Sequence, residues 1–466
     1  MLRRVASVPC NRSRLAANSA DTKAWCPMRI AMVGTGYVGL VSAACLSEFG
    51  HHVACVDSDT RKIADLNAGR VPIFEPGLEE MIGANVKARR LSFTAQLDEA
   101  VQGSEAIFIA VGTPSRRGDG HADLSFVFSA AEEVARSVDR EAVLVTKSTV
   151  PVGTSREVER IVRQVRPELA FDFASNPEFL REGSAIVDFL RPDRVVVGCD
   201  TENAKGVLKE IYRPLYLNET PILFTGRETA ELIKYAANAF LATKITFINE
   251  MADLCEKLGA DVQDVARGIG LDGRIGSKFL HAGPGFGGSC FPKDTVALLR
   301  TSQEAGAPTR IVETVVAVNE ARKREMANRI IAAFGGIAGK TVAVLGLTFK
   351  PNTDDMREAP SLAIIPALRA EGARIQAYDP EGGREACRLL DIDLCNDVYQ
   401  AISGADGVVI LTEWNEFRAL DLDRIKTLLK RPLMVDLRNI YRPQQMAEAG
   451  FDYFSVGRPP DRERAT

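Results

Sequence analysis

Residues 34–39 read GTGYVG and directly follow an apolar run at residues 29–33. In a turn of this spacing the first glycine permits a tight bend, the second lets the backbone approach a pyrophosphate, and the third allows the following helix to pack closely. The next β-rich run ends at Asp57, where a carboxylate accepts hydrogen bonds from an adenosine ribose and repels a 2′-phosphate. The motif predicts a dinucleotide-binding unit that prefers NAD to NADP, although Arg61 and Lys62 just downstream argue the other way. A glycine turn that packs without a ligand is the alternative.

Apolar β-rich runs alternate with helical patterns through the first part of the chain, which is typical of a parallel α/β sheet. Strands are expected at residues 29–33, 52–57, 106–111, 142–147, 172–175 and 194–198. The same rhythm returns after Gly339, with strands expected at 341–347, 374–379, 407–412 and 433–436. Residues 34–57 and 346–379 each span a glycine turn, a helix, a strand and an acid. We therefore expect an α/β fold with two doubly wound, Rossmann-like domains related by a weak internal duplication.

The middle of the chain is expected to be helical. From Thr229 to Leu258 no helix breaker interrupts a helical period of apolar residues, and Gly259 follows as a stop signal. At about 1.5 Å per residue this segment predicts a helix of about 45 Å, and more helix is expected at residues 311–334. We expect a central helical domain at residues 226–330, between a first domain at 28–225 and a third at 331–460. Such long central helices usually connect domains or pair subunits.

The composition of the chain excludes several classes of function. Its 466 residues carry 58 basic and 62 acidic side chains, and the net charge of -4 gives no footprint for nucleic acid. Nine cysteines without a C-x-x-C pair and only four histidines argue against a disulfide framework or a metal site, and favour a reducing, cytoplasmic compartment. The uncharged stretch Ile30–Ser47 contains the glycine turn, so we interpret it as strand, turn and helix rather than as a membrane span.

The first 27 residues differ from the rest of the sequence. They hold five basic residues against one acid, Asp21, and they lack the apolar core of a secretory signal. Because Met28 immediately precedes the first apolar run, we expect these residues to be a disordered tail or the product of an over-extended gene start. An organellar transit peptide is the alternative.

A cysteine loop at residues 283–294, which reads GPGFGGSCFPKD, carries a strong chemical signal. Its glycines indicate a backbone that approaches a ligand closely. Cys290 precedes Pro292, a residue favoured in the first turn of a helix, so the sulfur is expected near a helix N-terminus with Lys293 beside it. Both neighbours lower the pKa of a thiol, and we predict that Cys290 is a nucleophile.

Two pairs of polar residues with a four-residue spacing could face this cysteine. Lys234 and Asn238 share one face of the long predicted helix, although a helical lysine usually faces solvent. Glu178 and Glu182 follow the end of a predicted strand, and paired carboxylates can divide the roles of base and binding group. At two further strand ends, residues 111–114 (VGTP) and 147–151 (KSTVP) place small hydroxyl side chains where α/β sheets bind ligands. These could line the nicotinamide side of a cofactor or form ordinary turns.

Six motifs, in order, resemble those of the UDP-glucose 6-dehydrogenase family. They are residues 34–39, 111–114, 176–180 (NPEFL), 234–238 (KYAAN), 287–290 (GGSC) and 349–350 (FK), and the likeness extends from Met28 to about Arg458. GDP-mannose dehydrogenases share most of these motifs, but residues 234–238 and 274–276 (RIG) resemble the glucose enzymes more. The first 27 residues have no counterpart in typical members.

The resemblance implies an NAD-dependent, four-electron oxidation of UDP-glucose to UDP-glucuronate at a single site. Cys290 would add to the aldehyde intermediate to give a thiohemiacetal, whose loss of hydride would leave a thioester. Water would then hydrolyse the thioester with the help of Glu178 or Glu182, and the resemblance leaves open which of the two is the base.

Other catalytic roles also follow from the resemblance. Lys234 and Asn238 would stabilise oxyanion charge, while Asp294 and Thr149 would hold a water that works with Lys234 in proton transfer. Arg274 would bind substrate in the site of a neighbouring subunit, which implies a homodimer or a larger assembly built on the central helices.

The resemblance also assigns contacts to the two ligands. Together with Gly34, Gly36 and Gly39 of the turn, the cofactor contacts are Tyr37, Val38, Asp57, Lys62, Thr113, Thr149, Glu182, Lys293 and Arg357. The substrate contacts are Phe179, Leu180, Arg181, Glu182, Lys234, Asn238, Phe279, Leu280, His281, Ala282, Gly283, Gly287, Lys350 and Arg438. Of these, Lys350 and Arg438 carry charge that suits a diphosphate.

Three alternatives to this function stay open at the level of the sequence. GDP-mannose is the nearest alternative substrate. A protein of another class could keep the dinucleotide fold as a binding or regulatory module without turnover. A single-step hydroxyacid dehydrogenase of the same two-domain plan would leave Cys290 idle.

Overall fold

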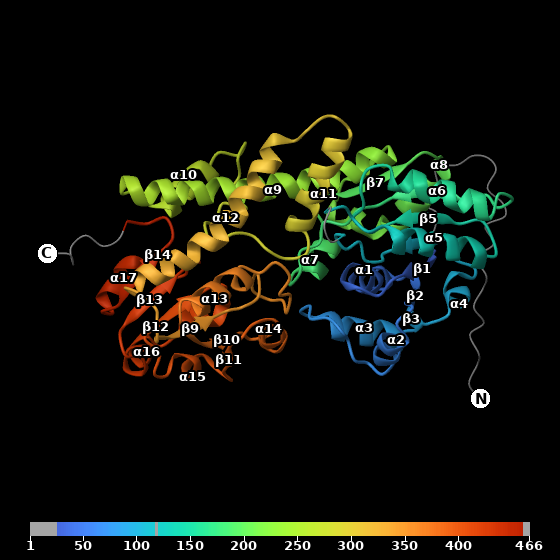
Figure 1. The fold of residues 1–466 in the computed structure, drawn as a ribbon. Coiled ribbons are helices and arrows are strands. Elements are labelled where there is room, and N and C mark those ends of the chain that lie inside the picture. Colours follow the sequence, from blue (N-terminus) through green and yellow to red (C-terminus); the bar gives the residue numbers. More distant parts are fainter. Residues whose placement is uncertain (1–25, 117–119, 460–466) are drawn as a thin grey trace.

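The computed structural model describes residues 26–116 and 120–459 and contains two α/β domains that a long helix, α9 (Arg227–Leu258), joins along one side (Figure 1). Residues 1–25 and 460–466 lie outside the described residues. The expectation for the N-terminal leader concerns residues 1–27, of which only 26 and 27 are described, and the expected end of the third domain at residue 460 also lies outside the described residues.

The first domain is built on a parallel sheet. Within the described residues this sheet has eight strands in the order β3-β2-β1-β4-β5-β6-β7-β8, and only β6 and β7 pair antiparallel. The strands are β1 (Arg29–Val33), β2 (His52–Val56), β3 (Leu91–Thr94), β4 (Ala106–Ile109), β5 (Val143–Thr146), β6 (Asp172–Ser175), β7 (Val195–Cys199) and β8 (Ile222–Thr225). The six strands expected from the sequence are present, and β3 and β8 are additional.

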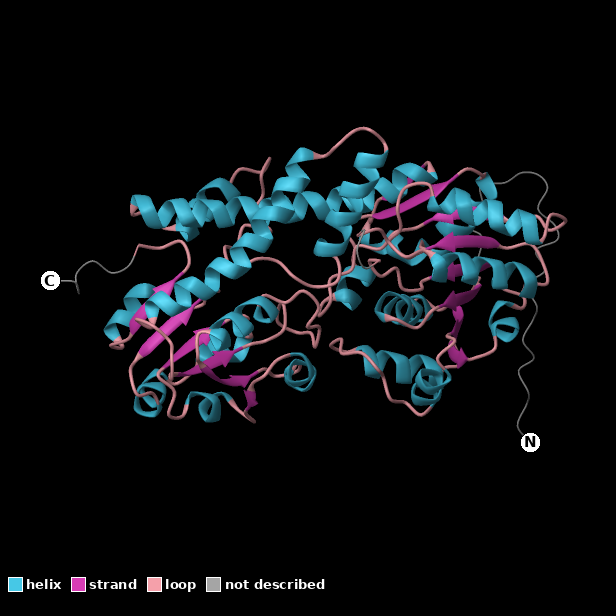
Figure 2. Ribbon diagram, viewed as in Figure 1, coloured by secondary structure: helices cyan, strands magenta, loops and turns pink. Residues whose placement is uncertain are grey.

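Both faces of this sheet are buried, as helical crossovers require in a parallel sheet. Ile30 and Met32 of β1 belong to one apolar cluster, while Ala31 and Val33 belong to another on the opposite face. Figure 2 shows helices packed around the strands. The helices are α1 (Tyr37–Glu48), α2 (Thr60–Asn67), α3 (Leu78–Lys87), α4 (Leu97–Val101), α5 (Ser125–Ser137), α6 (Thr154–Val165), α7 (Ala185–Leu190) and α8 (Glu202–Ile211).

The interpretation of Ile30–Ser47 as strand, turn and helix is confirmed by β1 and α1. Helix α1 is buried continuously from Gly39 to Ser47, which explains why its sequence carries no charge. Among the described residues no helix combines the length and apolarity needed to cross a membrane.

Helix α9 runs from the first domain into the second. It begins at Arg227 and ends at Leu258, where Gly259 adopts φ +75° and donates its N–H to Cys255 O. The predicted helix and stop signal are thus confirmed. Near its start α9 packs on β6 and β7, and near its end Ile248 and Ala252 join the core of the second domain. The other central helices are α10 (Val262–Gly270), α11 (Phe291–Glu304) and α12 (Arg310–Ala333).

The second domain repeats the topology of the first. Its described strands follow the order β11-β10-β9-β12-β13-β14, which matches β3-β2-β1-β4-β5-β6. The strands are β9 (Thr341–Leu345), β10 (Arg374–Tyr378), β11 (Asp393–Leu394), β12 (Gly407–Ile410), β13 (Leu433–Asp436) and β14 (Asp452–Ser455), and the helices are α13 (Ser361–Ala370), α14 (Gly383–Leu389), α15 (Val398–Ile402), α16 (Leu422–Leu428) and α17 (Pro443–Glu448).

The two glycine turns are equivalent in detail. The N–H of Gly34 donates to Val56 O at 2.8 Å, and the N–H of Gly346 donates to Tyr378 O at 2.8 Å. Both glycines have positive φ, at +101° and +84°. The expected fold of two Rossmann-like domains and a central helical region is therefore confirmed.

Candidate active site

The glycine turn between β1 and α1 leaves backbone exposed at a helix N-terminus. A Cβ at Gly34 would lie 2.6 Å from Ala110 O, and one at Gly39 would lie 2.0 Å from Gly34 O. A Cβ at Gly36 would meet nothing within 4 Å, so this backbone faces open space. The turn thus offers close backbone approach and helix N–H groups together, which is what a pyrophosphate needs.

Asp57 lies at the end of β2 beside this turn. Its Oδ2 accepts the N–H and the hydroxyl of Thr35 at 2.9 and 2.7 Å, and Lys62 Nζ lies 3.1 Å away. Burial alone would raise the pKa of Asp57, but the hydrogen bonds from Asp59, Thr35 and Lys62 outweigh it and lower that pKa. The group is therefore a carboxylate, as recognition of a ribose hydroxyl requires.

The equivalent acid of the second domain, Asp379, is not open to a ligand. It is 5% exposed, and it accepts the N–H of Leu347 at 2.6 Å, that of Gly382 at 2.7 Å and Trp414 Nε1 at 3.3 Å. Because Asp379 is buried and bonded to its own chain, it cannot contact a ribose. Of the two glycine turns, the one in the first domain is therefore the one that fits a dinucleotide.

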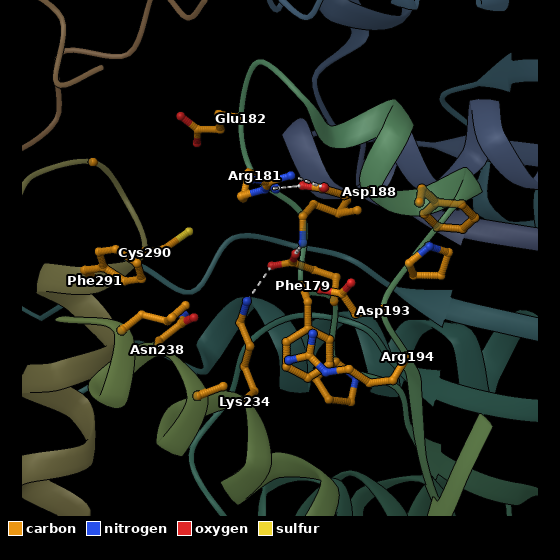
Figure 3. A pocket seen from close by; sticks show the side chains of 18 of the residues that line it. Phe179, Arg181, Glu182, Asp188, Asp193, Arg194, Lys234, Asn238, Cys290 and Phe291 are labelled. Carbon is orange, nitrogen blue, oxygen red and sulfur yellow. Dashed lines mark hydrogen bonds and ion pairs between the residues drawn. The ribbon is translucent and has the colours of Figure 1, made fainter. Parts of the chain in front are cut away.

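A cavity of about 790 Å³ lies beside α9, between the loop that follows β6 and the cysteine loop (Figure 3). The sequence-predicted residues that line it are Glu178, Phe179, Leu180, Arg181, Glu182, Lys234, Asn238, Phe279, Gly287, Cys290 and Lys350. The fold therefore brings the cysteine together with both four-residue pairs.

Cys290 is the N-cap residue of α11, with Pro292 in the first turn, as its sequence context predicts. The expectation of a lowered thiol pKa is wrong for the free protein, because burial raises the pKa of Cys290 and the charges of Glu178 and Asp294 add to the rise. The charge of Lys234 lowers the pKa of Cys290, but by less than burial and the two carboxylates raise it. Lys293, which was expected to help, is paired with Asp294 at 2.7 Å.

Lys234 and Glu178 form an ion pair on one side of the cavity, with Nζ and Oε1 3.1 Å apart (Figure 3). Burial would lower the pKa of Lys234, but the negative charges of Glu178 and its neighbours outweigh this effect and raise it. Lys234 Nζ also lies 5.4 Å from the centre of the Phe179 ring. The cavity thus presents a permanent ammonium near the sulfur.

Asn238 lies one turn along α9 from Lys234 and donates from Nδ2 to Asp294 Oδ2 at 2.6 Å. Asp294 is 1% exposed and accepts Lys293 Nζ on its other oxygen. This contact fixes the orientation of the Asn238 amide, so the carboxylate of Asp294 acts on the cavity through the amide.

Glu182 lies where three parts of the chain meet. Its Oε1 accepts Ser289 Oγ at 3.1 Å and Arg357 Nη2 at 3.2 Å, and its backbone O accepts Lys350 Nζ at 2.5 Å. Burial, and secondly the charge of Asp355, raise the pKa of Glu182 to about 7. This carboxyl group therefore changes charge near neutral pH.

Several sequence-predicted residues do not line the cavity. Thr113 Oγ1 donates to Thr149 O at 2.9 Å, so these two strand ends are joined. Leu280 and Ala282 pack in the core of the second domain, and Arg274 is exposed beside Asp272. His281 is also exposed.

Two further predicted substrate contacts have partners within the chain. Gly283 N–H donates to Asn249 Oδ1 at 2.9 Å and Gly283 O accepts Arg322 Nε at 2.7 Å, so both of its backbone groups are already bonded. Arg438 donates to Leu411 O at 2.7 Å and lies 3.1 Å from Glu413.

Sequence reasoning missed five basic residues that line the cavity, namely Lys147, Arg191, Arg194, Lys244 and Lys278. The guanidinium of Arg194 stacks on the Phe179 ring, 3.7 Å from its centre (Figure 3). Lys147 is buried and donates to Asn176 Oδ1 at 3.2 Å and Tyr212 O–H at 3.3 Å, and burial lowers its pKa to about 8. Lys147 falls within the KSTVP motif, whose position at a strand end was the available signal.

Models of one family match successive parts of the chain. They are the UDP-glucose/GDP-mannose dehydrogenase family NAD binding domain at residues 28–216, its central domain at 228–321 and its UDP binding domain at 343–443.

Individual proteins match over nearly the same length. The chain is 62% identical over 436 residues to a UDP-glucose 6-dehydrogenase of Rhizobium meliloti, which covers 93% of this chain and 100% of the relative. It is 47% identical to the UDP-glucose 6-dehydrogenase TuaD of Bacillus subtilis, over 93% and 94% of the two chains. A solved UDP-glucose dehydrogenase from Pyrobaculum islandicum superposes with a TM-score of 0.87 at 39% identity, over 94% and 100% of the two chains. The chain therefore belongs to the UDP-glucose/GDP-mannose dehydrogenase family and is an NAD-dependent oxidoreductase.

Proposed function

We propose that the chain oxidises UDP-glucose to UDP-glucuronate in two successive NAD-dependent steps at one site. The observation that carries the proposal is the placement of Cys290 in one cavity with Lys234, Glu178 and Asn238. The 62% identity to a protein named UDP-glucose 6-dehydrogenase supports UDP-glucose as the substrate.

When bound, NAD would lie on the glycine turn with Asp57 at its ribose, and it would supply the hydride acceptor for each oxidation. Gly36 and Tyr37 would offer backbone N–H groups to the pyrophosphate, while Thr113, Thr149 and Arg357 would line the nicotinamide side. The remaining cofactor contacts in this assignment are Gly34, Val38, Gly39, Lys62, Glu182 and Lys293.

In the first oxidation the substrate hydroxyl loses its proton as its carbon loses a hydride. A water held by Asp294 and Thr149 works with Lys234 to pass this proton to solvent, and the ammonium of Lys234 stabilises the developing alkoxide. The product of this step is an aldehyde, which carries no hydride that can leave without prior addition of a nucleophile.

In the second oxidation the S–H of Cys290 adds across the aldehyde C=O, so that a C–S bond forms and the oxygen gains the proton. As the same carbon loses its hydride, the hydroxyl proton leaves to solvent through the bound water, and Lys234 and Asn238 stabilise the negative charge that develops on the oxygen while the thioester forms. Water then attacks the thioester carbon with Glu178 or Glu182 as base, the C–S bond breaks, and the thiol is restored with the carboxylate product.

The test is to offer UDP-glucose and GDP-mannose separately to the wild-type chain and to a Cys290→Ser variant. We expect UDP-glucose turnover to acid in the wild type, and loss of acid formation with retained NADH binding in the variant. Turnover of GDP-mannose alone would overturn only the choice of substrate, which the family as a whole leaves open. No turnover of either sugar would indicate a binding protein instead.

We further propose three functional parts: an NAD domain at residues 28–225, a central helical part at 226–330 and a UDP-sugar domain at 331–460. Lys350 and Arg438 of the last part bind the diphosphate, and backbone groups of Phe279, Leu280, His281, Ala282 and Gly287 complete the substrate site with Phe179, Leu180 and Arg181, whereas the backbone groups of Gly283 are bonded to Asn249 and Arg322. The test is binding of uridine diphosphate, which we expect Lys350→Ala to weaken at least about tenfold. Unchanged binding would remove Lys350 from the site.

The chain is proposed to act as a cytoplasmic homodimer built on α9. This helix exposes apolar side chains along its length, namely Leu232, Phe240, Phe247, Leu254 and Leu258. Arg274, exposed and outside the cavity of its own chain, then reaches the site of the partner. Sedimentation should give a dimer, and Phe247→Asp should shift it toward monomer. A wild-type monomer with full activity would contradict this assembly.

A further inference from the structure

Glu75 is a buried carboxylate to which the proposed function assigns no role. It lies in the loop between α2 and α3, two residues before Gly77, the N-cap residue of α3. Its exposed fraction is 6%, whereas Glu79 and Glu80 in the next turn are exposed. A carboxylate buried to this extent needs partners that replace water.

The partners of Glu75 come from two distant segments. Its Oε2 accepts the N–H of Gly183 at 2.6 Å, and its Oε1 accepts the N–H of Ala185, the first residue of α7, at 2.7 Å. The hydroxyl of Tyr37, the first residue of α1, donates to Oε2 as well. One side chain thus ties the end of the loop that bears Glu178 and Glu182 to the glycine turn.

The loop at residues 178–183 is also confined on the side that faces the second domain. A Cβ at Gly183 would lie 2.4 Å from Asn352 O, so the second domain abuts the backbone here. The preceding residue, Glu182, contacts Ser289, the neighbour of Cys290. Hydrogen bonds, together with the peptide bond between Glu182 and Gly183, therefore connect Tyr37 through Glu75 to the cysteine loop.

We propose that Glu75 is a positioning residue, which holds the carboxylate loop at residues 178–182 in register with the dinucleotide turn. A glutamine at this position can accept only one of the two backbone N–H groups, because its amide nitrogen is a donor. The other N–H would lose its carboxylate acceptor, with at most the longer contact of Gly183 N to the Tyr37 hydroxyl at 3.3 Å remaining, and the loop would shift. The kinetic consequence rests on the proposed function, whereas the structural one does not.

The test compares Glu75→Gln in the full chain with the matched control Glu79→Gln. For Glu75→Gln we expect kcat for UDP-glucose oxidation to fall about tenfold or more, with KM for NAD within about threefold, since small displacements of a catalytic group cost one to two orders of magnitude. Glu79→Gln should behave as wild type.

A second readout needs neither sugar nor cofactor. The rate at which iodoacetamide alkylates Cys290, followed by peptide mass spectrometry, should change at least about threefold in Glu75→Gln, because Glu182 contacts the residue beside the sulfur. If Glu75→Gln does not fold, the same measurements are made on Glu75→Asp. Aspartate keeps the negative charge, but its side chain is too short to bond both backbone N–H groups.

The outcomes separate this inference from the proposed function. Unchanged kcat and alkylation in a folded Glu75 variant would overturn the positioning role, as would a rise in KM for NAD alone. A loss of activity that only follows the loss of folded protein would overturn it too. A wild-type chain that does not oxidise UDP-glucose would refute the proposed function, and the alkylation rates would still decide the role of Glu75.

Discussion

Lys234 Nζ and Glu178 Oε1 lie 3.1 Å apart, and the two side chains are only 3% and 5% exposed. Because each charge is removed from water, each depends on the other for compensation. The pair also places an ammonium near Cys290, where it is the largest influence that lowers the thiol pKa. The stability of the fold and the proposed chemistry of Cys290 therefore both depend on the ion pair between Lys234 and Glu178.

Removing one member of this pair should destabilise the fold and abolish most activity. We expect Lys234→Met to lower the free energy of unfolding by about 3 to 5 kcal/mol, because it leaves Glu178 buried without a partner. The double variant Lys234→Met with Glu178→Gln should recover much of that stability and none of the activity. Urea unfolding and NADH production measure the two effects, with exposed Lys209→Met as control. Equal stability of the two Lys234 variants would contradict the pairing.

The pH dependence of stability should report Glu182. Its folded pKa is raised to about 7 by burial and Asp355, so the folded state binds more protons than the unfolded state between the ordinary carboxyl pKa and that value. The wild type should therefore lose stability relative to Glu182→Gln as pH rises through this window, and the difference should level off above it. Urea unfolding at constant ionic strength measures it. A wild type that gains stability relative to the variant over that range would show that the pKa is lowered.

Cofactor choice should depend on Asp57. Replacing it with serine removes the charge that repels a 2′-phosphate and frees Lys62, which now lies 3.1 Å from it. We expect Asp57→Ser to raise KM for NAD about tenfold or more and to give measurable turnover with NADP. Asp65→Asn, on the exposed part of α2, is the control. An Asp57→Ser variant that keeps its NAD preference would remove this residue from cofactor recognition.

The thiol of Cys290 should be slow to react in the free protein, since burial and two carboxylates raise its pKa. At neutral pH its alkylation by iodoacetamide should lag behind that of Cys387, which is exposed on α14 and serves as an internal reference. Lys234→Met should slow Cys290 further and leave Cys387 unchanged. Fast alkylation of Cys290 at neutral pH would show a thiolate and contradict the raised pKa.

Local patterns in the sequence were enough to predict most of the fold. The spacing of Gly34, Gly36 and Gly39 predicted the first turn, and Gly259 predicted the end of α9, because each depends on the backbone of a few neighbouring residues. The strands β3 and β8 were missed because each is four residues long and only partly buried, so neither gives a long apolar run.

The electrostatics of the site could not be predicted in the same way. The position of Cys290 at a helix N-terminus followed from Pro292, yet the direction of its pKa did not. That direction depends on burial and on Glu178 and Asp294, and Glu178 comes from a different domain. Glu75 was missed for the same reason, since its partners Gly183 and Ala185 are more than a hundred residues away in the chain.

The central claim is that Cys290 enables a second oxidation at the site of the first. The most direct test is the number of NADH molecules formed per UDP-glucose consumed, measured at completion with limiting sugar. The account predicts about two for the wild type, with UDP-glucuronate as the product, and no acid from Cys290→Ser. A ratio of one in the wild type, or full acid formation by the serine variant, would contradict it.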